Sequence, residues 1–276
     1  MTPSCRGVLA TKDYCLCAGL SVRKNVLADH HGVVETRRVP PSQEVLIIDC
    51  RVLGADVCSK GWVGVATAPG STEAYFGRTI GDLLTAVEAD GRTDAVAIDI
   101  PIGLPDNSLR LADELARVAA GGRWQSVFMT PVRDALLAGD HATAVAVNRR
   151  LAGTGVSRQA YGLRSKIFEV EAWVRECGRT VVEAHPEVCF ATMAGSPLTT
   201  RKKTWAGAEQ RRKLLDRAGI RLKSDLGMAG EMAAVDDILD AAATAWTARR
   251  LVTGEATSMP ERPEVFSDGI ECAIWA

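Results

Sequence analysis

Several acidic residues of this 276-residue chain stand where a charged side chain is costly unless it is paired or coordinated. Asp56 and Asp99 each come at the end of a short apolar run typical of a buried strand, and Glu183 lies near the end of a third run. Functional residues of α/β sheets gather at the carboxyl ends of strands. We therefore expect these carboxylates to meet at one edge of a sheet, although each alone could instead cap the next turn.

Three further aspartates, Asp236, Asp237 and Asp240, share one face of a predicted helix over residues 231–252. Like charges at this spacing destabilise a helix, and a bound cation would remove that penalty. The alternative is that Asp236 and Asp237 are there only because acidic residues favour the positive N-terminal end of a helix. That alternative explains Asp240 less well, because Asp240 lies about one turn further into the helix.

Carboxylate clusters of this kind suit phosphodiester hydrolysis with Mg²⁺ or Mn²⁺, because hard divalent ions prefer oxygen ligands. Two ions about 4 Å apart activate a water and stabilise the leaving oxygen. We predict that two such ions are held by Asp56, Asp99, Asp237 and Asp240, with Glu183 completing the catalytic set. The sequence lacks a GxSxG nucleophile elbow and a Walker A loop, and its histidines lack zinc-like spacing.

The candidates for binding substrate are basic or histidine side chains near these acids: Lys60, Arg110, Arg117, His185 and Lys203. Arg110 and Arg117 lie on one face of a predicted helix and could grip a phosphate. They could equally form a local pair with Asp113, which lies on the same face.

A nucleic-acid partner would suit the charge distribution, since residues 157–223 carry an excess of Lys and Arg and residues 224–276 an excess of Asp and Glu. The run Arg201-Lys202-Lys203 could follow a phosphate backbone, and Trp124 and Trp205 could stack on bases. Alternatively, the charged stretches are solvated helix faces, the basic run is a solvated loop, and the two tryptophans belong to the core.

The elements that must position these residues alternate along the chain. Strands are predicted over 52–56, 61–66, 73–78, 95–100 and 180–184, and helices over 82–89, 109–119, 135–151, 163–177, 205–218 and 231–252. This order predicts an α/β fold with a mixed sheet and flanking helices. We expect one domain over residues 49–276 with a helical insert at about 109–177, preceded by a poorly ordered extension over residues 1–48.

The composition, 47% hydrophobic and 24% charged with a net charge of −1, is that of a globular protein. No apolar run is long enough to span a membrane, and the eight cysteines show no regular framework. We expect a cytoplasmic protein with no membrane partner, and the sequence leaves its oligomeric state open.

Six segments recur in the same order in one protein family. They are Gly54-Ala55-Asp56 with Gly61-Trp62, AIDIPIGLP (97–105), SVFMTP (126–131), KIFEV (166–170), EAHPE (183–187) and DDILDA (236–241). Over about residues 52–253 the chain resembles domain-of-unknown-function family 429, often labelled a predicted ribonuclease-H-like nuclease. The resemblance implies a ribonuclease-H-like core with Asp56 on the first strand, Asp99 on the fourth, and Asp237 or Asp240 on the last helix.

Two rival functions remain open on the same fold. An actin-like ATPase-related phosphotransferase has an Asp-containing hairpin after its first strand, comparable to residues 56–61, but needs two such domains. A non-catalytic binding module would keep the fold without needing intact acids.

The sequence departs from the family pattern in two respects. The family's first motif usually lies near the start of the chain, whereas here about 50 residues precede Asp56. The helical insert is also longer than in a minimal ribonuclease H.

Overall fold

The computed structural model describes residues 50–276, which build one seven-stranded mixed sheet in the order β3-β2-β1-β4-β5-β7-β6. The strands are β1 (Val52–Cys58), β2 (Gly61–Ala68), β3 (Ser71–Gly77), β4 (Ala95–Ile98), β5 (Thr180–Ala184), β6 (Ser258–Val265) and β7 (Glu271–Trp275). The extension predicted over residues 1–48 lies outside the described residues.

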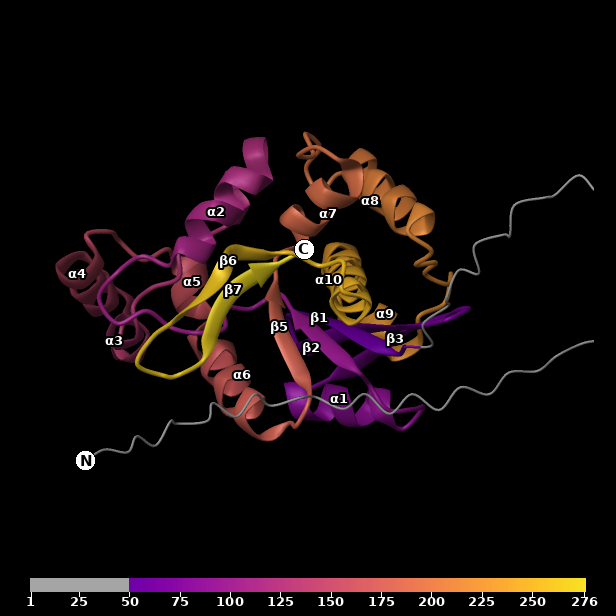
Figure 1. Ribbon diagram of the computed structural model, residues 1–276, viewed down its shortest axis with the longest axis horizontal. Coiled ribbons are helices and arrows are strands. Elements are labelled where there is room, and N and C mark those ends of the chain that lie inside the picture. Colours follow the sequence, from indigo (N-terminus) through magenta and orange to yellow (C-terminus); the bar gives the residue numbers. More distant parts are fainter. Residues whose placement is uncertain (1–49) are drawn as a thin grey trace, which may run out of the picture. The chain divides into compact units, whose positions relative to one another are not determined.

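Antiparallel hairpins join β1, β2 and β3, after which β4, β5 and β7 add in parallel and β6 closes the far edge antiparallel to β7. This mixed sheet with helices around it is an α/β fold with a ribonuclease-H-like arrangement, as the sequence predicts (Figure 1).

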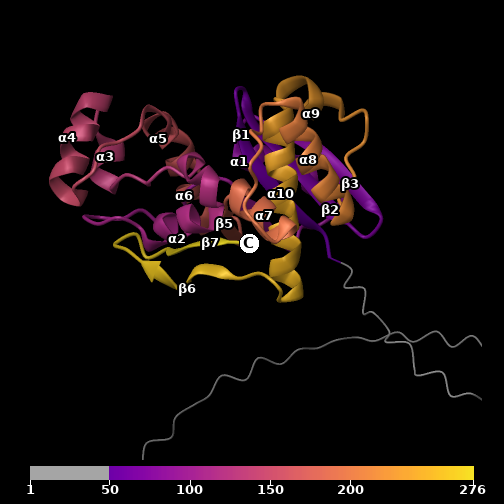
Figure 2. The ribbon, with the colours of Figure 1, turned by 90° about the horizontal axis from the view of Figure 1, so that it is seen from above.

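Helices flank the sheet, most of them between β4 and β5 or after β5. They are α1 (Ile80–Glu88), α2 (Leu111–Ala120), α3 (Arg133–Leu137), α4 (His141–Ala152), α5 (Arg158–Gly162), α6 (Arg164–Glu176), α7 (Pro186–Ala194), α8 (Trp205–Arg217), α9 (Gly227–Met232) and α10 (Val235–Thr253), with a 3-10 turn at Gly121–Ser126. In both views α3, α4 and α5 group apart from α8, α9 and α10 (Figures 1 and 2). Among residues 50–276, no helix has both the length and the apolar character that crossing a membrane requires.

Two cores cover the opposite faces of the sheet, because successive side chains of a strand point to opposite sides. Val52 and Ala97 belong to a core completed by α7, α8 and α10. Leu53, Val96 and Ile98 belong to a second core completed by α1 and α6. The α10 helix packs on β1, β2 and β4, so its face of the sheet is where the candidate site forms.

The structure corrects several predicted boundaries. The helix predicted over 135–151 is two helices, α3 and α4, because Asp140 caps the start of α4 by accepting from the backbone N–H of Thr143. The last helix begins at Val235 rather than at residue 231, since α9 ends at Met232. Helix α7 and the C-terminal strands β6 and β7 were not predicted.

Candidate metal centre

Asp56 and Asp99 come from adjacent parallel strands and face α10. Asp56 lies in β1, and Asp99 follows the last residue of β4, where its backbone N–H donates to the carbonyl of Ala55 at 2.9 Å. Strand alternation places both side chains on the same side as Val52 and Ala97, the side that α10 covers. The two carboxylates are therefore neighbours because their strands are in register.

The third carboxylate, Asp240, comes from α10 and reaches the sheet because the helix lies directly on β1. A Cβ atom on Gly54 would lie 2.0 Å from the backbone nitrogen of Ala245 and 2.1 Å from the carbonyl oxygen of Ala241. Only glycine permits this approach, and it brings the residues one turn earlier in α10 to the end of β1. Asp240 is 1% exposed as a result.

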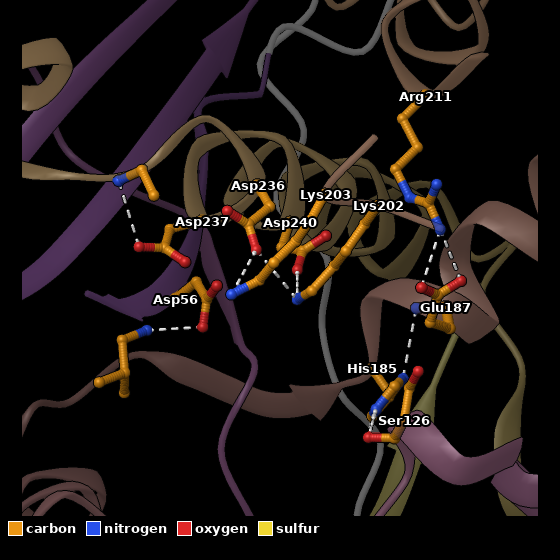
Figure 3. Close-up of polar contacts among 12 residues, drawn as sticks. Asp56, Ser126, His185, Glu187, Lys202, Lys203, Arg211, Asp236, Asp237 and Asp240 are labelled. Carbon is orange, nitrogen blue, oxygen red and sulfur yellow. Dashed lines mark hydrogen bonds and ion pairs between the residues drawn. The ribbon is translucent and has the colours of Figure 1, made fainter. Parts of the chain in front are cut away.

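Asp56, Asp99 and Asp240 each offer a carboxylate oxygen within 4.8 Å of the others. The backbone N–H of Val57 donates to Oδ1 of Asp56 at 2.6 Å, and Nζ of Lys202 donates to Oδ2 of Asp240 at 2.5 Å (Figure 3). Oδ1 of Asp240 is buried and has no hydrogen-bond partner within residues 50–276. A buried carboxylate oxygen without a partner is costly, and a bound cation would satisfy it.

Burial and mutual repulsion make the cluster hard to ionise fully. Burial raises the pKa of Asp56 well above its usual value, and Asp99 and Asp240 raise it further. Burial also raises the pKa of Asp99, against an opposing effect of His185 and Lys202. For Asp240, burial outweighs the attraction of Lys202 and raises the pKa to about 7. The cluster thus holds protons that a cation could displace.

Lys202 supplies a positive charge in direct contact with these acids, a position that was not predicted from the sequence. Burial acts to lower its pKa, but Asp240, Asp99 and Asp56 together raise the pKa above that of an ordinary lysine. Its Nζ also lies 3.9 Å from Oδ2 of Asp236. The sequence signal for Lys202 was its place in the basic run Arg201-Lys202-Lys203. From this run only Lys203 was predicted to bind substrate.

A cavity of about 550 Å³ opens over the cluster. Its lining includes the three clustered aspartates, and polar side chains such as Ser126, Gln159 and His185 complete it. The cavity is large enough for a small ligand or a segment of a larger one.

The structure places Glu183 in the lining of the same cavity but not in the cluster. In the β4–β5 register Glu183 lies level with Ile98, so its side chain points to the opposite face of the sheet from Asp99. There its carboxylate accepts from the backbone N–H of Ile102 at 2.8 Å and from Nη2 of Arg110 at 2.7 Å. Burial raises the pKa of Glu183 to about 7, although Arg110 lowers it.

Arg110 and Arg117 are both engaged within the protein. Arg110 is fully buried, and its Nε lies 3.5 Å from Oδ1 of Asp113, the local pair that the sequence left as an alternative, while its Nη2 pairs with Glu183. Nε of Arg117 donates to the carbonyl of Val127 at 2.8 Å, and its guanidinium lies over the ring of Trp124. In this structure neither arginine is presented to the cavity.

The remaining predicted residues lie around the cluster. Asp237 accepts from the backbone N–H of Ala234 at 3.3 Å, which places it as a cap of α10 beside the three clustered acids. His185 caps α7 and has Nε2 3.4 Å from the carbonyl of Ser126. The side chain of Lys203 is 80% exposed, and that of Lys60 contacts the sulfur of Met232.

A buried ion pair next to the cavity was missed by sequence reasoning. Glu187 accepts from Nη2 of Arg211 with both carboxylate oxygens at 2.8 Å, and Arg211 is fully buried. The pair joins α7 to α8, and Arg211 also lies over the ring of Phe190. Glu187 could have been noticed because it lies in the segment EAHPE. Its partner Arg211 lies on another helix, and the sequence does not reveal how the two helices pack.

The three clustered residues could hold a metal ion. All offer carboxylate oxygens, they come from three separate elements, and one of their buried oxygens lacks a partner. Such an arrangement can hold an ion at the end of the sheet, facing the cavity.

Comparison with protein-family models gives one match, "Protein of unknown function (DUF429)", over residues 54–265. No curated protein and no solved structure matches the chain in the corresponding comparisons. The matched residues run from β1 into β6 and include the three clustered aspartates. The chain belongs to the DUF429 family.

Proposed function

We propose that this protein is a metal-dependent nuclease that hydrolyses phosphodiester bonds of nucleic acid. The observation that carries the proposal is the convergence of Asp56, Asp99 and Asp240, from β1, the end of β4 and α10, on one point of a ribonuclease-H-like sheet. Mg²⁺ or Mn²⁺ is the ion that such oxygen ligands would hold.

A bound divalent ion would supply Lewis-acid activation of a water and stabilisation of the leaving oxygen. The residues of the chain hold and orient the reacting groups. Asp56 is fixed by the hydrogen bond from the N–H of Val57, and Asp240 by the packing of α10 on Gly54. Rigid placement of this kind lowers the barrier because no reorganisation is needed during the reaction.

The cavity lining and the adjoining start of α8 suit a polyanion whose bases can stack on an aromatic ring. Lys203 lines the cavity and keeps most of its side chain in solvent. Trp205, two residues further on at the start of α8, is 85% exposed. A lysine beside an exposed tryptophan can pair with phosphate and stack on a base, which supports nucleic acid as the substrate.

The test is a cleavage assay with Mn²⁺ over single-stranded, duplex, hybrid and branched substrates. We expect cleavage of at least one substrate, and a loss of about 100-fold or more in Asp56→Asn, because removing metal stabilisation costs several kcal/mol. Asp216→Asn, an exposed residue of α8, is the matched control and should keep full activity. Metal-independent cleavage, or equal activity of Asp56→Asn, would contradict the proposal.

The same samples separate the two rival functions. An actin-like phosphotransferase would hydrolyse ATP rather than nucleic acid, and it would need a second domain, whereas residues 50–276 contain one such sheet. A binding module would retain nucleic acid without cleaving it in any metal.

A further inference from the structure

Lys202 is placed as a cation within the carboxylate cluster. Its Nζ donates to Oδ2 of Asp240 at 2.5 Å and lies 3.9 Å from Oδ2 of Asp236 (Figure 3). Two-thirds of its side chain is removed from solvent. The ammonium therefore occupies one side of the cluster, while the unpartnered Oδ1 of Asp240 remains on the same carboxylate.

The loop that carries Lys202 is held in place by the start of α8. A Cβ atom on Gly207 would lie 1.9 Å from the carbonyl oxygen of Arg201, so the loop backbone rests against the first turn of the helix. The hydroxyl of Thr204 donates to the carbonyl of Arg201 at 2.8 Å and accepts from the N–H of Gly207 at 3.1 Å. The position of the lysine is thus built by several contacts rather than by one flexible side chain.

The helix α8 is itself anchored beneath the cavity. Arg211, one turn further along, forms the buried two-oxygen pair with Glu187 of α7 and donates to the carbonyl of Gly207 at 3.2 Å. The fold therefore ties the loop, through α8, to Glu187 of α7, which lines the cavity.

We propose that Lys202 takes the place of one of two cations, so that the cluster binds one divalent ion instead of the two expected from its acids. This inference rests on the proposed function, of which it specifies the metal count. The three ligand carboxylates carry three negative charges, which one divalent ion and one ammonium balance. The two neighbouring acids have other partners: Asp236 lies 3.9 Å from Nζ of Lys203, and Asp237 caps α10. A second divalent ion that shared the Asp240 carboxylate would have to displace Nζ of Lys202 from Oδ2.

In this arrangement the divalent ion is shared by Asp56, Asp99 and the free oxygen of Asp240, and Lys202 neutralises the other oxygen of Asp240. Lys202 is then a positioning residue that can also stabilise negative charge on the substrate phosphate in place of a second ion.

The test counts bound Mn²⁺ on the full chain, by electron paramagnetic resonance of the free ion and by calorimetric titration. We expect one ion on the wild type and two on Lys202→Met, which keeps most of the unbranched side chain but removes its charged end. Lys213→Met is the matched control, because the Lys213 side chain lies mostly in solvent and pairs with Glu209 of the same helix, and this variant should still bind one ion. Asp240→Asn should bind none.

Thermal melts in EDTA verify that each variant is folded. If Lys202→Met does not fold, Lys202→Gln replaces it in the ion count. Two ions on the wild type, or one ion of unchanged affinity on Lys202→Met, would overturn the inference and leave the proposed function standing. A wild type that binds no ion at all would overturn the proposed function as well.

Discussion

Gly54 of β1 lies so close to Ala245 of α10 that a Cβ atom on the glycine would stand 2.0 Å from the helix backbone nitrogen. Helices usually pack on sheets through side chains, at a spacing set by those side chains. Here backbone meets backbone, and the helix sits low enough for Asp240 to join Asp56 and Asp99.

Substitution of Gly54 by alanine should therefore damage both the fold and the site. The overlap is with backbone atoms that cannot rotate away, so we expect a loss of about 1–3 kcal/mol or more in the free energy of unfolding. Thermal and urea melts measure it. Gly139→Ala is the control, since a Cβ atom there meets nothing within 4 Å. Equal stability of the two variants would show that α10 is not seated on Gly54.

Asp240 and Asp237 should respond differently to neutralisation. Asp240→Asn should abolish stabilisation by Mn²⁺, which for wild type is about 2.7 kcal/mol at one hundred times the dissociation constant. Asp237→Asn should keep the metal effect and lose only part of a helix cap, about 0.5–2 kcal/mol. Melting temperatures with EDTA and with Mn²⁺ separate these effects. Loss of the metal effect in Asp237→Asn would place its carboxylate among the ligands.

Titration of Asp240 should make the metal-free protein less stable as pH rises through the range from about 4 to 7. The folded pKa of Asp240 is about 7, whereas an unfolded aspartate has a value of about 3.9, so the folded state holds an extra proton within this window. The stability that this proton contributes is present below the lower value and lost as pH rises through the upper one. Asp240→Asn removes the effect.

Urea melts in EDTA across this pH range measure the difference in unfolding free energy between wild type and Asp240→Asn. Groups far from the cluster contribute equally to both proteins and cancel, so the difference reports Asp240 together with its effect on Asp56 and Asp99. The variant should gain relative to wild type as pH rises, and a constant difference would mean that Asp240 titrates normally.

Trp205 should contribute to nucleic-acid affinity without affecting the fold. It is 85% exposed, and base stacking on tryptophan is worth about 1–3 kcal/mol. Trp205→Ala should therefore weaken binding of a single-stranded oligonucleotide in EDTA by about 5-fold to 150-fold, measured by fluorescence anisotropy. Leu137→Ala, an exposed apolar residue of α3, is the control. Unchanged affinity in Trp205→Ala would assign this side chain no role in binding.

The central part of the fold was predictable because its strands are short apolar runs with clear turns between them. The same alternation explains why Asp56 and Asp99, both at strand ends, share a face. The sequence could not show that Glu183 points away from them, because that depends on the register between β4 and β5, which pairs Glu183 with Ile98. Register is a property of strand pairing and not of either strand alone.

The elements that were missed lack the periodic signals on which prediction depends. Most residues of α7 are buried, so it shows no polar face, and its N-terminal Pro186 resembles the end of a strand. Strand β6 contains Pro260 and Pro263, which argue against a strand but are tolerated at the edge of a sheet. Lys202 was missed because its loop shows its role only when folded against α10.

The most direct test of the central claim is anomalous diffraction from crystals grown with Mn²⁺. The account predicts an anomalous peak between the carboxylates of Asp56, Asp99 and Asp240, and no such peak in crystals of Asp240→Asn grown in the same way. Wild-type crystals without an anomalous peak at this position would contradict the assignment of these residues as a metal centre.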